Sequence, residues 1–106
     1  MTLLDLQRVL QKTNLPVYHY EAVEVDFPYI VYQEYAETYS FASGSTYKEN
    51  IAVEIYFFTK TEFDPAWDML KQTLIKNNVF FRTSISYEGA EVTMYNLSTT
   101  ITHEYE

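Results

Sequence analysis

The stretch that decides the fold is Ile51-Ala52-Val53-Glu54-Ile55-Tyr56-Phe57-Phe58. Every second residue from Ile51 to Phe57 is a branched aliphatic or aromatic residue, and in an extended strand such residues share one face. The opposite face carries a mixed set, Ala52, Glu54, Tyr56 and Phe58. We therefore predict a strand over residues 51–58 that turns one face to an apolar core.

The chain begins with a helical pattern rather than an alternating one. The hydroxyl of Thr2 can accept a hydrogen bond from a free N–H of a first helical turn. Pro16 disfavours helical geometry in the residue before it. Between them, apolar residues recur three and four positions apart, at Leu3, Leu6, Val9 and Leu10. These signals predict a helix over residues 3–13.

Between this helix and the deciding strand the pattern is β-like. Tyr29 and Val31 alternate with polar neighbours, while Pro28 interrupts the chain just before them. Small polar residues around Gly44 indicate a hairpin tip or loop. The predicted segments are a strand at 17–25, a break at 26–28, a strand at 29–39 and a loop at 40–45.

After the deciding strand we predict a second helix that opens at Thr61 and ends at Asn77-Asn78. Pro65 suits a first turn, whose N–H groups lack intrahelical partners. Its apolar stripe is Phe63, Trp67, Leu70 and Leu74. A strand at 79–87, a turn at 88–90 and a final strand at 92–103 complete the chain. We place Val92 and Met94 on one face and Leu97 and Ile101 on the other, and therefore predict a β-bulge near Asn96.

The predicted order of elements is α-β-β-β-α-β-β, which implies an α+β fold. Its expected form is a mainly antiparallel sheet with two helices packed on one face. A chain of 106 residues is of the size that one core serves. We therefore treat residues 1–106 as a single domain.

The charge balance argues against two classes of partner. The chain has 15 acidic and 7 basic residues and a net charge of −8, whereas sequence-independent binding to nucleic acid or anionic membrane needs clustered Lys and Arg. Asp5 and Arg8 stand where a signal peptide would be apolar, and no apolar run reaches the roughly 20 residues of a membrane span. Without cysteine, disulfides and thiolate sites are also excluded. We expect a protein made in the cytoplasm, with no membrane partner.

Catalytic and metal-binding patterns are sparse. The chain has two histidines, His19 and His103. His19 and Glu21 would share a strand face, but Glu24 would point away from them, so this set makes a weak metal site. Two glycines cannot build a phosphate-binding loop of the Gly-rich kinds. We predict no catalytic, cofactor-binding or metal-binding residues.

The aromatic residues carry a stronger signal. The chain has 11 tyrosines, more than one small core can bury. Tyr29, Tyr35 and Tyr39 are predicted on one strand face, and Tyr32 on the other. Stacking on single-stranded nucleic acid would need a basic groove, which an acidic chain does not supply. Contact with protein is the stronger interpretation, because tyrosine is enriched at interfaces.

With these elements assigned, the sequence resembles the small tail terminator, or tail completion and tail-to-head joining, proteins of long-tailed bacteriophages. The resemblance covers almost the whole chain. It is carried by Leu15-Pro16-Val17-Tyr18, by Phe27-Pro28-Tyr29-Ile30-Val31-Tyr32, by residues 51–60, by the helix through Trp67 and Leu70, and by residues 88–95. One departure is Ser43-Gly44-Ser45-Thr46, where the family often has an Asp.

The resemblance implies a non-enzymatic virion protein, assembled in the host cytoplasm. It would form a ring, commonly a hexamer, at the head-proximal end of the tail tube. Its partners would be itself, the tube protein and the head-neck connector proteins, while DNA passes through without specific binding. An acidic lumen would repel the phosphates of that DNA. Termination of the tube and joining to the head both remain open.

Two sets of residues fit such a ring. We predict residues 36–50 to be a loop that makes assembly contacts through Tyr39, Phe41 and Tyr47; a hairpin tip without a role is the alternative. We predict a lumen or inter-subunit surface from the acidic residues, with ordinary solubilising charge as the alternative. This acidic set is Glu21, Glu24, Asp26, Glu34 and Glu37.

Two other functions stay open on sequence grounds. The first is a monomeric adaptor that binds a peptide or protein through an exposed strand edge. The second is a small hydrolase or metal-dependent enzyme, which the missing motifs disfavour.

Overall fold

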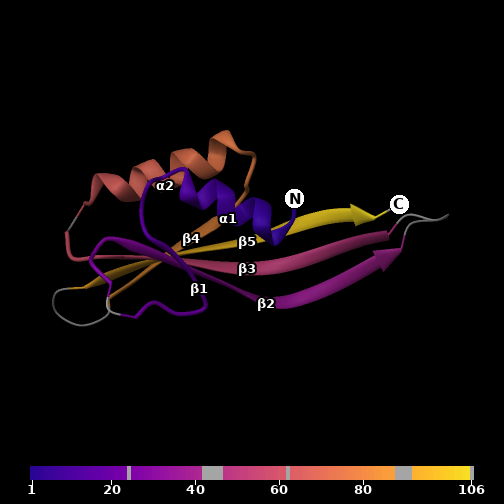
Figure 1. The fold of residues 1–106 in the computed structure, drawn as a ribbon, viewed down its shortest axis with the longest axis horizontal. Coiled ribbons are helices and arrows are strands. Elements are labelled where there is room, and N and C mark those ends of the chain that lie inside the picture. Colours follow the sequence, from indigo (N-terminus) through magenta and orange to yellow (C-terminus); the bar gives the residue numbers. More distant parts are fainter. Residues whose placement is uncertain (24, 42–46, 62, 88–91, 106) are drawn as a thin grey trace.

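The computed structural model describes residues 1–23, 25–41, 47–61, 63–87 and 92–105. Two helices and a five-stranded, mostly antiparallel sheet follow in the order α-β-β-β-α-β-β, which confirms the predicted α+β class and element order. Figure 1 shows the two helices lying together on one side of the sheet. The elements are α1 (Leu3–Gln11), β1 (Val17–His19), β2 (Tyr29–Phe41), β3 (Tyr47–Thr59), α2 (Pro65–Lys76), β4 (Arg82–Tyr87) and β5 (Thr93–Tyr105).

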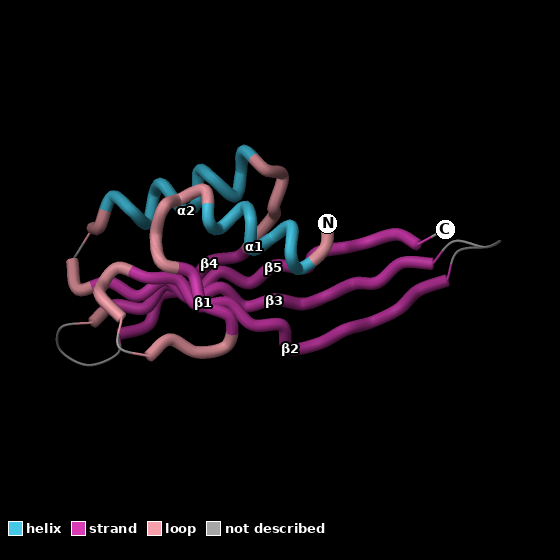
Figure 2. Tube along the Cα trace, in the orientation of Figure 1, coloured by secondary structure: helices cyan, strands magenta, loops and turns pink. Residues whose placement is uncertain are grey.

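The sheet has the strand order β1-β2-β3-β5-β4. β3 is its centre, because it pairs along its whole length with β5, from Tyr47 opposite Tyr105 to Thr59 opposite Thr93. β1 pairs with β2 in parallel and β4 pairs with β5 antiparallel. Figure 2 shows the long middle strands running past the helices, and the molecule measures 53 × 24 × 23 Å.

The core lies between the helices and one face of the sheet. Alternate residues of β3, from Ile51 to Phe57, are buried on that face, as are Leu97 and Ile101 of β5. The helices contribute buried leucines and a valine to the same cluster: Leu6, Val9, Leu10, Leu70 and Leu74. The alternation of apolar residues that predicted the deciding strand therefore also identifies the face of the sheet that the helices cover.

Both helices begin at the residues that cap them. In α1, the Thr2 hydroxyl accepts a hydrogen bond from the Asp5 N–H, and the Asp5 carboxylate accepts one from the Thr2 N–H. Asp64 caps α2 and also accepts a hydrogen bond from the Thr59 hydroxyl at 2.6 Å, which ties the helix to the end of β3. Phe63, predicted in the apolar stripe, is 87% exposed, because it precedes the helix at a φ of 55°.

Two predicted strand boundaries and one predicted bulge are wrong. β1 ends at His19 rather than at residue 25, and β4 begins at Arg82 rather than at residue 79. The predicted bulge near Asn96 is absent from the register of β5. Val92 and Met94 simply occupy even positions, which face away from the helices, whereas Leu97 and Ile101 occupy odd ones. The register shift lies instead in β2, between Glu34 and Ala36.

Candidate assembly surface

The sheet extends beyond the helices as a three-stranded arm. We define the arm as residues 36–41 of β2, 47–50 of β3 and 102–105 of β5, which stay paired to one another. The core ends at Ile51 and Ile101, which are opposite each other just inside the arm. Figure 1 shows the C-terminal ends of β2 and β5, with β3 between them, running beyond both helices. The arm is therefore backbone-paired structure without a core of its own.

The prediction of a loop over residues 36–50 is wrong for the part of it that the structure describes. Residues 36–41 and 47–50 are strand, and only the segment 42–46 with Gly44 lies outside the described residues. The physical reason is the third strand. β5 pairs with residues 47–50 of β3, so the hairpin is supported as part of a sheet rather than alone.

Two predicted contact residues, Tyr39 and Tyr47, lie side by side on the arm. Their ring centroids are 6.3 Å apart with the planes tilted by 47°. Tyr39 is 53% exposed, and its hydroxyl donates a long hydrogen bond to Glu37 at 3.4 Å. The carboxylates of Glu49 and Glu37 raise the pKa of the Tyr39 phenol, so the ring stays neutral at physiological pH. The third predicted residue, Phe41, is in β2, and its side chain lies outside the described structure.

The other face of the arm is small and polar. Thr38, Asn50 and Thr102 form one row across the three strands, and the Thr102 hydroxyl donates to the Asn50 side chain at 2.9 Å. In a neighbouring row, the Lys48 ammonium lies 3.3 Å from the Glu104 carboxylate. Exposed surface pairs of this kind contribute little to stability. The two faces of the arm therefore differ: one bears aromatic and acidic groups, the other hydroxyls and amides.

The bulge at Tyr35 marks the base of the arm. Glu34 is opposite Val53 and Ala36 is opposite Ala52, so Tyr35 is an extra residue that has no cross-strand position of its own. The Tyr35 side chain is 59% exposed. Bulges bend a strand and increase its twist, and they are frequent at sheet edges, where they redirect a side chain. The structure thus separates the covered sheet from the arm at a defined residue.

A histidine-carboxylate pair lies at the edge of the covered sheet, just before the bulge. His19 Nε2 is 2.7 Å from a carboxylate oxygen of Glu34. The imidazole is stacked between the rings of Tyr20 and Tyr32, at centroid distances of 4.0 and 4.6 Å. The Tyr20 hydroxyl donates to the other Glu34 oxygen, and the Tyr32 hydroxyl donates to Gln7 of α1. This cluster fastens the short β1 edge to the helix.

The same contacts set the protonation of Glu34. Partial burial acts to raise the pKa of its carboxyl, but hydrogen bonds from Tyr20 and His19 outweigh it and lower the pKa overall. In return, the hydrogen bond to Glu34 raises the pKa of the Tyr20 phenol. Glu34 is therefore a carboxylate with a structural function. Its two oxygens are engaged by neighbours within the chain.

The structure does not gather the predicted acidic set on one surface. Glu34 and Glu37 are on the helix side of the sheet, opposite Val53 and Ile51 respectively. Glu21 instead lines a cavity against the helix-free face. Asp26 is in the segment between β1 and β2, and Glu24 lies outside the described residues.

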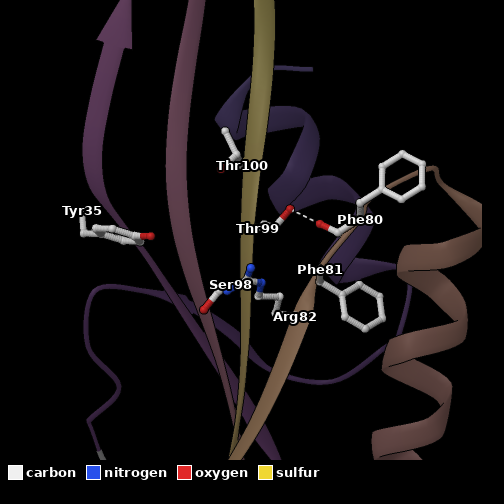
Figure 3. Close-up of a pocket in the computed structure, with 7 residues that line it drawn as sticks. All are labelled: Tyr35, Phe80, Phe81, Arg82, Ser98, Thr99 and Thr100. Atoms are coloured by element: carbon white, nitrogen blue, oxygen red, sulfur yellow. Dashed lines mark hydrogen bonds between the residues drawn. The ribbon is translucent and has the colours of Figure 1, made fainter.

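A shallow cavity of about 410 Å³ crosses the helix-free face at the base of the arm. Figure 3 shows Tyr35 pointing its hydroxyl over the sheet toward Ser98 and Arg82, while the Phe80 ring points away. The Ser98 hydroxyl is held by the carboxylate oxygens of Glu54, at 2.9 and 3.0 Å. This trough combines a phenol, a guanidinium and hydroxyls, and it is open rather than enclosed. Such a surface suits contact with another chain better than capture of a small molecule.

A second cavity, of about 460 Å³, lies between residues 20–22 and the sheet. Its floor is aromatic, with Tyr29 and Phe58 stacked at 4.9 Å and Tyr56 beside them. Burial raises the pKa of Tyr29. This small aromatic cluster under a loop explains several of the tyrosines that the main core cannot hold.

Sequence reasoning named Tyr35 among the exposed tyrosines but missed Phe80 and Arg82. Phe80 is 86% exposed, directly before β4 begins. Phe80 could have been identified from the sequence, because side chains alternate in a strand pattern only over residues 82–87. Phe80 then lies outside the strand. Within the described ranges, no group of three His, Cys, Asp or Glu side chains is placed to hold a metal ion. Of the helices formed by the described residues, none has the length and apolar content needed to span a bilayer.

Comparison with known proteins does not place the chain in a family. It matches none of the protein-family models against which it was scanned. A search of curated proteins also finds no significant similarity. The function therefore has to be inferred from the arm, the trough and the charge of the chain.

Proposed function

We propose that this protein is a non-enzymatic structural component of a phage tail, which forms a ring at the head-proximal end of the tail tube. In that position it terminates the tube, joins it to the neck of the head, or does both. The ring is a homo-oligomer, with six copies expected from the resemblance of the sequence to tail terminator proteins. Its other partners are the tube protein and the head-neck connector proteins.

The arm is the observation that carries this proposal. Three strands are extended past the last buried row at Ile51 and Ile101, although none of the arm side chains that the structure describes is part of the core. Ordering exposed backbone is entropically unfavourable, at roughly 1–2 kcal/mol per residue. A bare arm with paired tyrosines is therefore best explained as a surface that is completed by another chain, since Tyr is a preferred interface residue.

The charge of the chain supports a ring through which DNA passes. With a net charge of −8, the protein repels phosphate groups rather than binding them. The row of Thr38, Asn50 and Thr102 also offers DNA neutral groups without a cationic cluster. A channel wall built from such a chain lets a polyanion slide.

The test is assembly on tubes. Purified protein is added to polymerised tail-tube protein from the same genome, and the tube ends are viewed by negative-stain electron microscopy. The proposal predicts a ring at one end of each tube and an arrest of further growth at that end. Tubes that lengthen normally and carry no added density, together with a protein that stays monomeric at high concentration, would overturn it.

A second candidate is favoured by one observation. β4 has a single partner strand, and its residues 82–86 are exposed, so an extended peptide could add to this edge. An adaptor of that kind would bind its peptide as a monomer. The tube experiment separates the two, because an adaptor would leave the tube ends bare.

A further inference from the structure

The arm has two free strand edges, on opposite sides. β4 pairs with β5 only as far as Ser98, whereas β3 pairs with β5 up to Tyr105. From Thr99 to Tyr105, β5 therefore has a described partner strand on one side alone. β1 likewise pairs with β2 only as far as Tyr32. Over residues 33–41, the outer edge of β2 has no partner strand among the described residues.

The β5 edge presents outward backbone groups that an incoming strand could use, one of which, the Thr102 carbonyl, is bonded to the Met1 amino group within the chain. The Met1 amino group donates to the Thr102 carbonyl at 2.7 Å, so this backbone group points outward and accepts a donor from outside the sheet. Residues two apart direct their backbone groups to the same side, which places Thr100 and Glu104 in the same row of outward groups. The free length from 99 to 105 exceeds a typical strand of about 5–6 residues.

Cavities flank this edge on both sides. The trough of about 410 Å³ lies on the helix-free side, and a smaller cavity of about 230 Å³ lies on the helix side. Phe80 and Thr100 line both of them, and the Phe80 ring stands exposed at the point where β4 begins (Figure 3). A strand laid along β5 would end against this ring and place side chains in both cavities.

The two edges carry opposite charges. Arg82 lies where the free β5 edge begins, and the one carboxylate on this part of β5 with a described position, Glu104, is offset by Lys48 at 3.3 Å. The β2 edge carries Glu37, beside Glu34, whose carboxylate is already held by His19 and Tyr20. Charge complementarity thus favours pairing of one edge with the other, rather than of either edge with its own copy.

We propose that the free edge of β5 in one copy pairs with the free edge of β2 in the next copy. This inference rests on the proposed ring function and names its interface. Two different edges make a head-to-tail contact, which closes into a ring when the rotation between copies allows it.

The direction of the joining strands follows from the topology. β2 and β5 are each antiparallel to β3 and hence parallel to each other. Neighbouring copies that are related by rotation about an axis along the arm keep the same strand direction. The β5 strand of one copy is therefore parallel to the β2 strand of the next copy. Each face of the arm then continues as the same face in the next copy.

Cysteine cross-linking tests this interface, because the chain has no cysteine of its own. One variant carries Thr38→Cys on β2. A second set carries Thr100→Cys, Thr102→Cys or Glu104→Cys on β5, on the same face, to sample the register. Thr38 and Thr102 of one copy are two strands apart, about 10 Å, which is too far for a disulfide within the chain.

Each variant is concentrated and oxidised alone and in β2–β5 mixtures, with Ser84→Cys on β4 as the matched control. We expect cross-linked dimers in at least one mixture, at several times the yield of either variant alone, and a ladder of oligomers when one chain carries both cysteines. Equal yields from single variants, or cross-linking of Thr38→Cys to Ser84→Cys instead, would overturn the proposal. Rings that form without any β2–β5 cross-link would refute this interface and leave the ring function standing. A protein that neither oligomerises nor binds tube ends would refute both.

Discussion

The covered body of the sheet and its arm are made from the same three strands, yet their sequences differ in kind. On the helix side of the body, alternate residues are Val53, Ile55 and Phe57, all fully buried. On the same face of the sheet, two rows beyond Val53, the residues are Tyr39, Glu49 and His103. The pairing of the backbone is continuous, but the apolar pattern stops at Ile51. The buried rows of the body therefore hold the fold together, and the end of the apolar pattern at the arm supports its proposed role in assembly.

The largest contrast is expected from truncations in the two regions. Leu70→Ala should lower the free energy of unfolding by about 2–5 kcal/mol, because Leu70 is fully buried and a cavity remains. Tyr39→Ala on the arm should change it by about 1 kcal/mol or less. Urea unfolding followed by circular dichroism measures both. Met69→Ala, at the exposed neighbour of Leu70, is the control. Similar losses for Leu70 and Tyr39 would remove the distinction between body and arm.

One substitution made in both regions gives a smaller contrast. Thr2→Ala removes the hydroxyl that caps α1 and should cost about 1 kcal/mol of stability. Thr38→Ala on the arm should stay within about 0.5 kcal/mol, as is usual at exposed sites. Thermal unfolding of the two variants side by side measures the difference. A larger loss from Thr38 would show that the arm contributes to folding.

Glu34, at the boundary between the body and the arm, should make the stability of the protein depend on pH in the acidic range. Because the pKa of Glu34 is lowered in the folded protein, its carboxylate adds stability above the ordinary value of 4.5, and this is lost as the pH falls through the folded-state value. Glu34→Gln should therefore lose less stability than the wild type between about pH 6 and about pH 3. Urea midpoints across that range report the effect. Parallel curves for Glu34→Gln and the wild type would contradict the assignment.

Deletion of Tyr35 is expected to leave the stability nearly unchanged and to alter only the pairing of the arm. Glu34 and residue 36 would then occupy neighbouring cross-strand positions, so the ladder to β3 becomes regular without changing which side chains face the helices. The unfolding free energy should stay within about 1 kcal/mol of the wild type. Hydrogen exchange of residues 36–41 should slow. Unfolding of the whole domain would show that the bulge is required by the body.

The fold was predictable wherever one face of an element is buried. Leu6 and Leu10 at helical spacing, and Ile51 to Phe57 at a spacing of two, identified the covered surfaces correctly. The face away from the helices was harder, because Met94 and Phe58 are apolar there too and pack in the aromatic cluster. That led to the mistaken bulge at Asn96. The true bulge at Tyr35 has no local signal, since it depends on pairing with β3.

The assembly surface was only partly predictable. Tyr39 and Tyr47 were selected because the chain has more tyrosines than one small core can bury. The structure places their two rings in contact. The strand prediction for residues 29–39 is confirmed, but the strand character of residues 40–41 and 47–50 was missed, because polar residues and Gly44 indicate a loop when β5 is not considered. The acidic set was read as one surface, but pairing puts Glu34 with His19 and Glu21 on the other face. Residue spacing alone cannot reveal such long-range partners.

The central claim is that the arm serves assembly and not folding. The most direct measurement compares wild-type protein with Tyr39→Ser/Tyr47→Ser for capping of tail tubes and for urea unfolding, in one buffer. We predict that the double variant loses capping while its unfolding free energy stays within about 1–2 kcal/mol of the wild type. Full capping by the double variant, or a loss of stability as large as that of Leu70→Ala, would contradict the account.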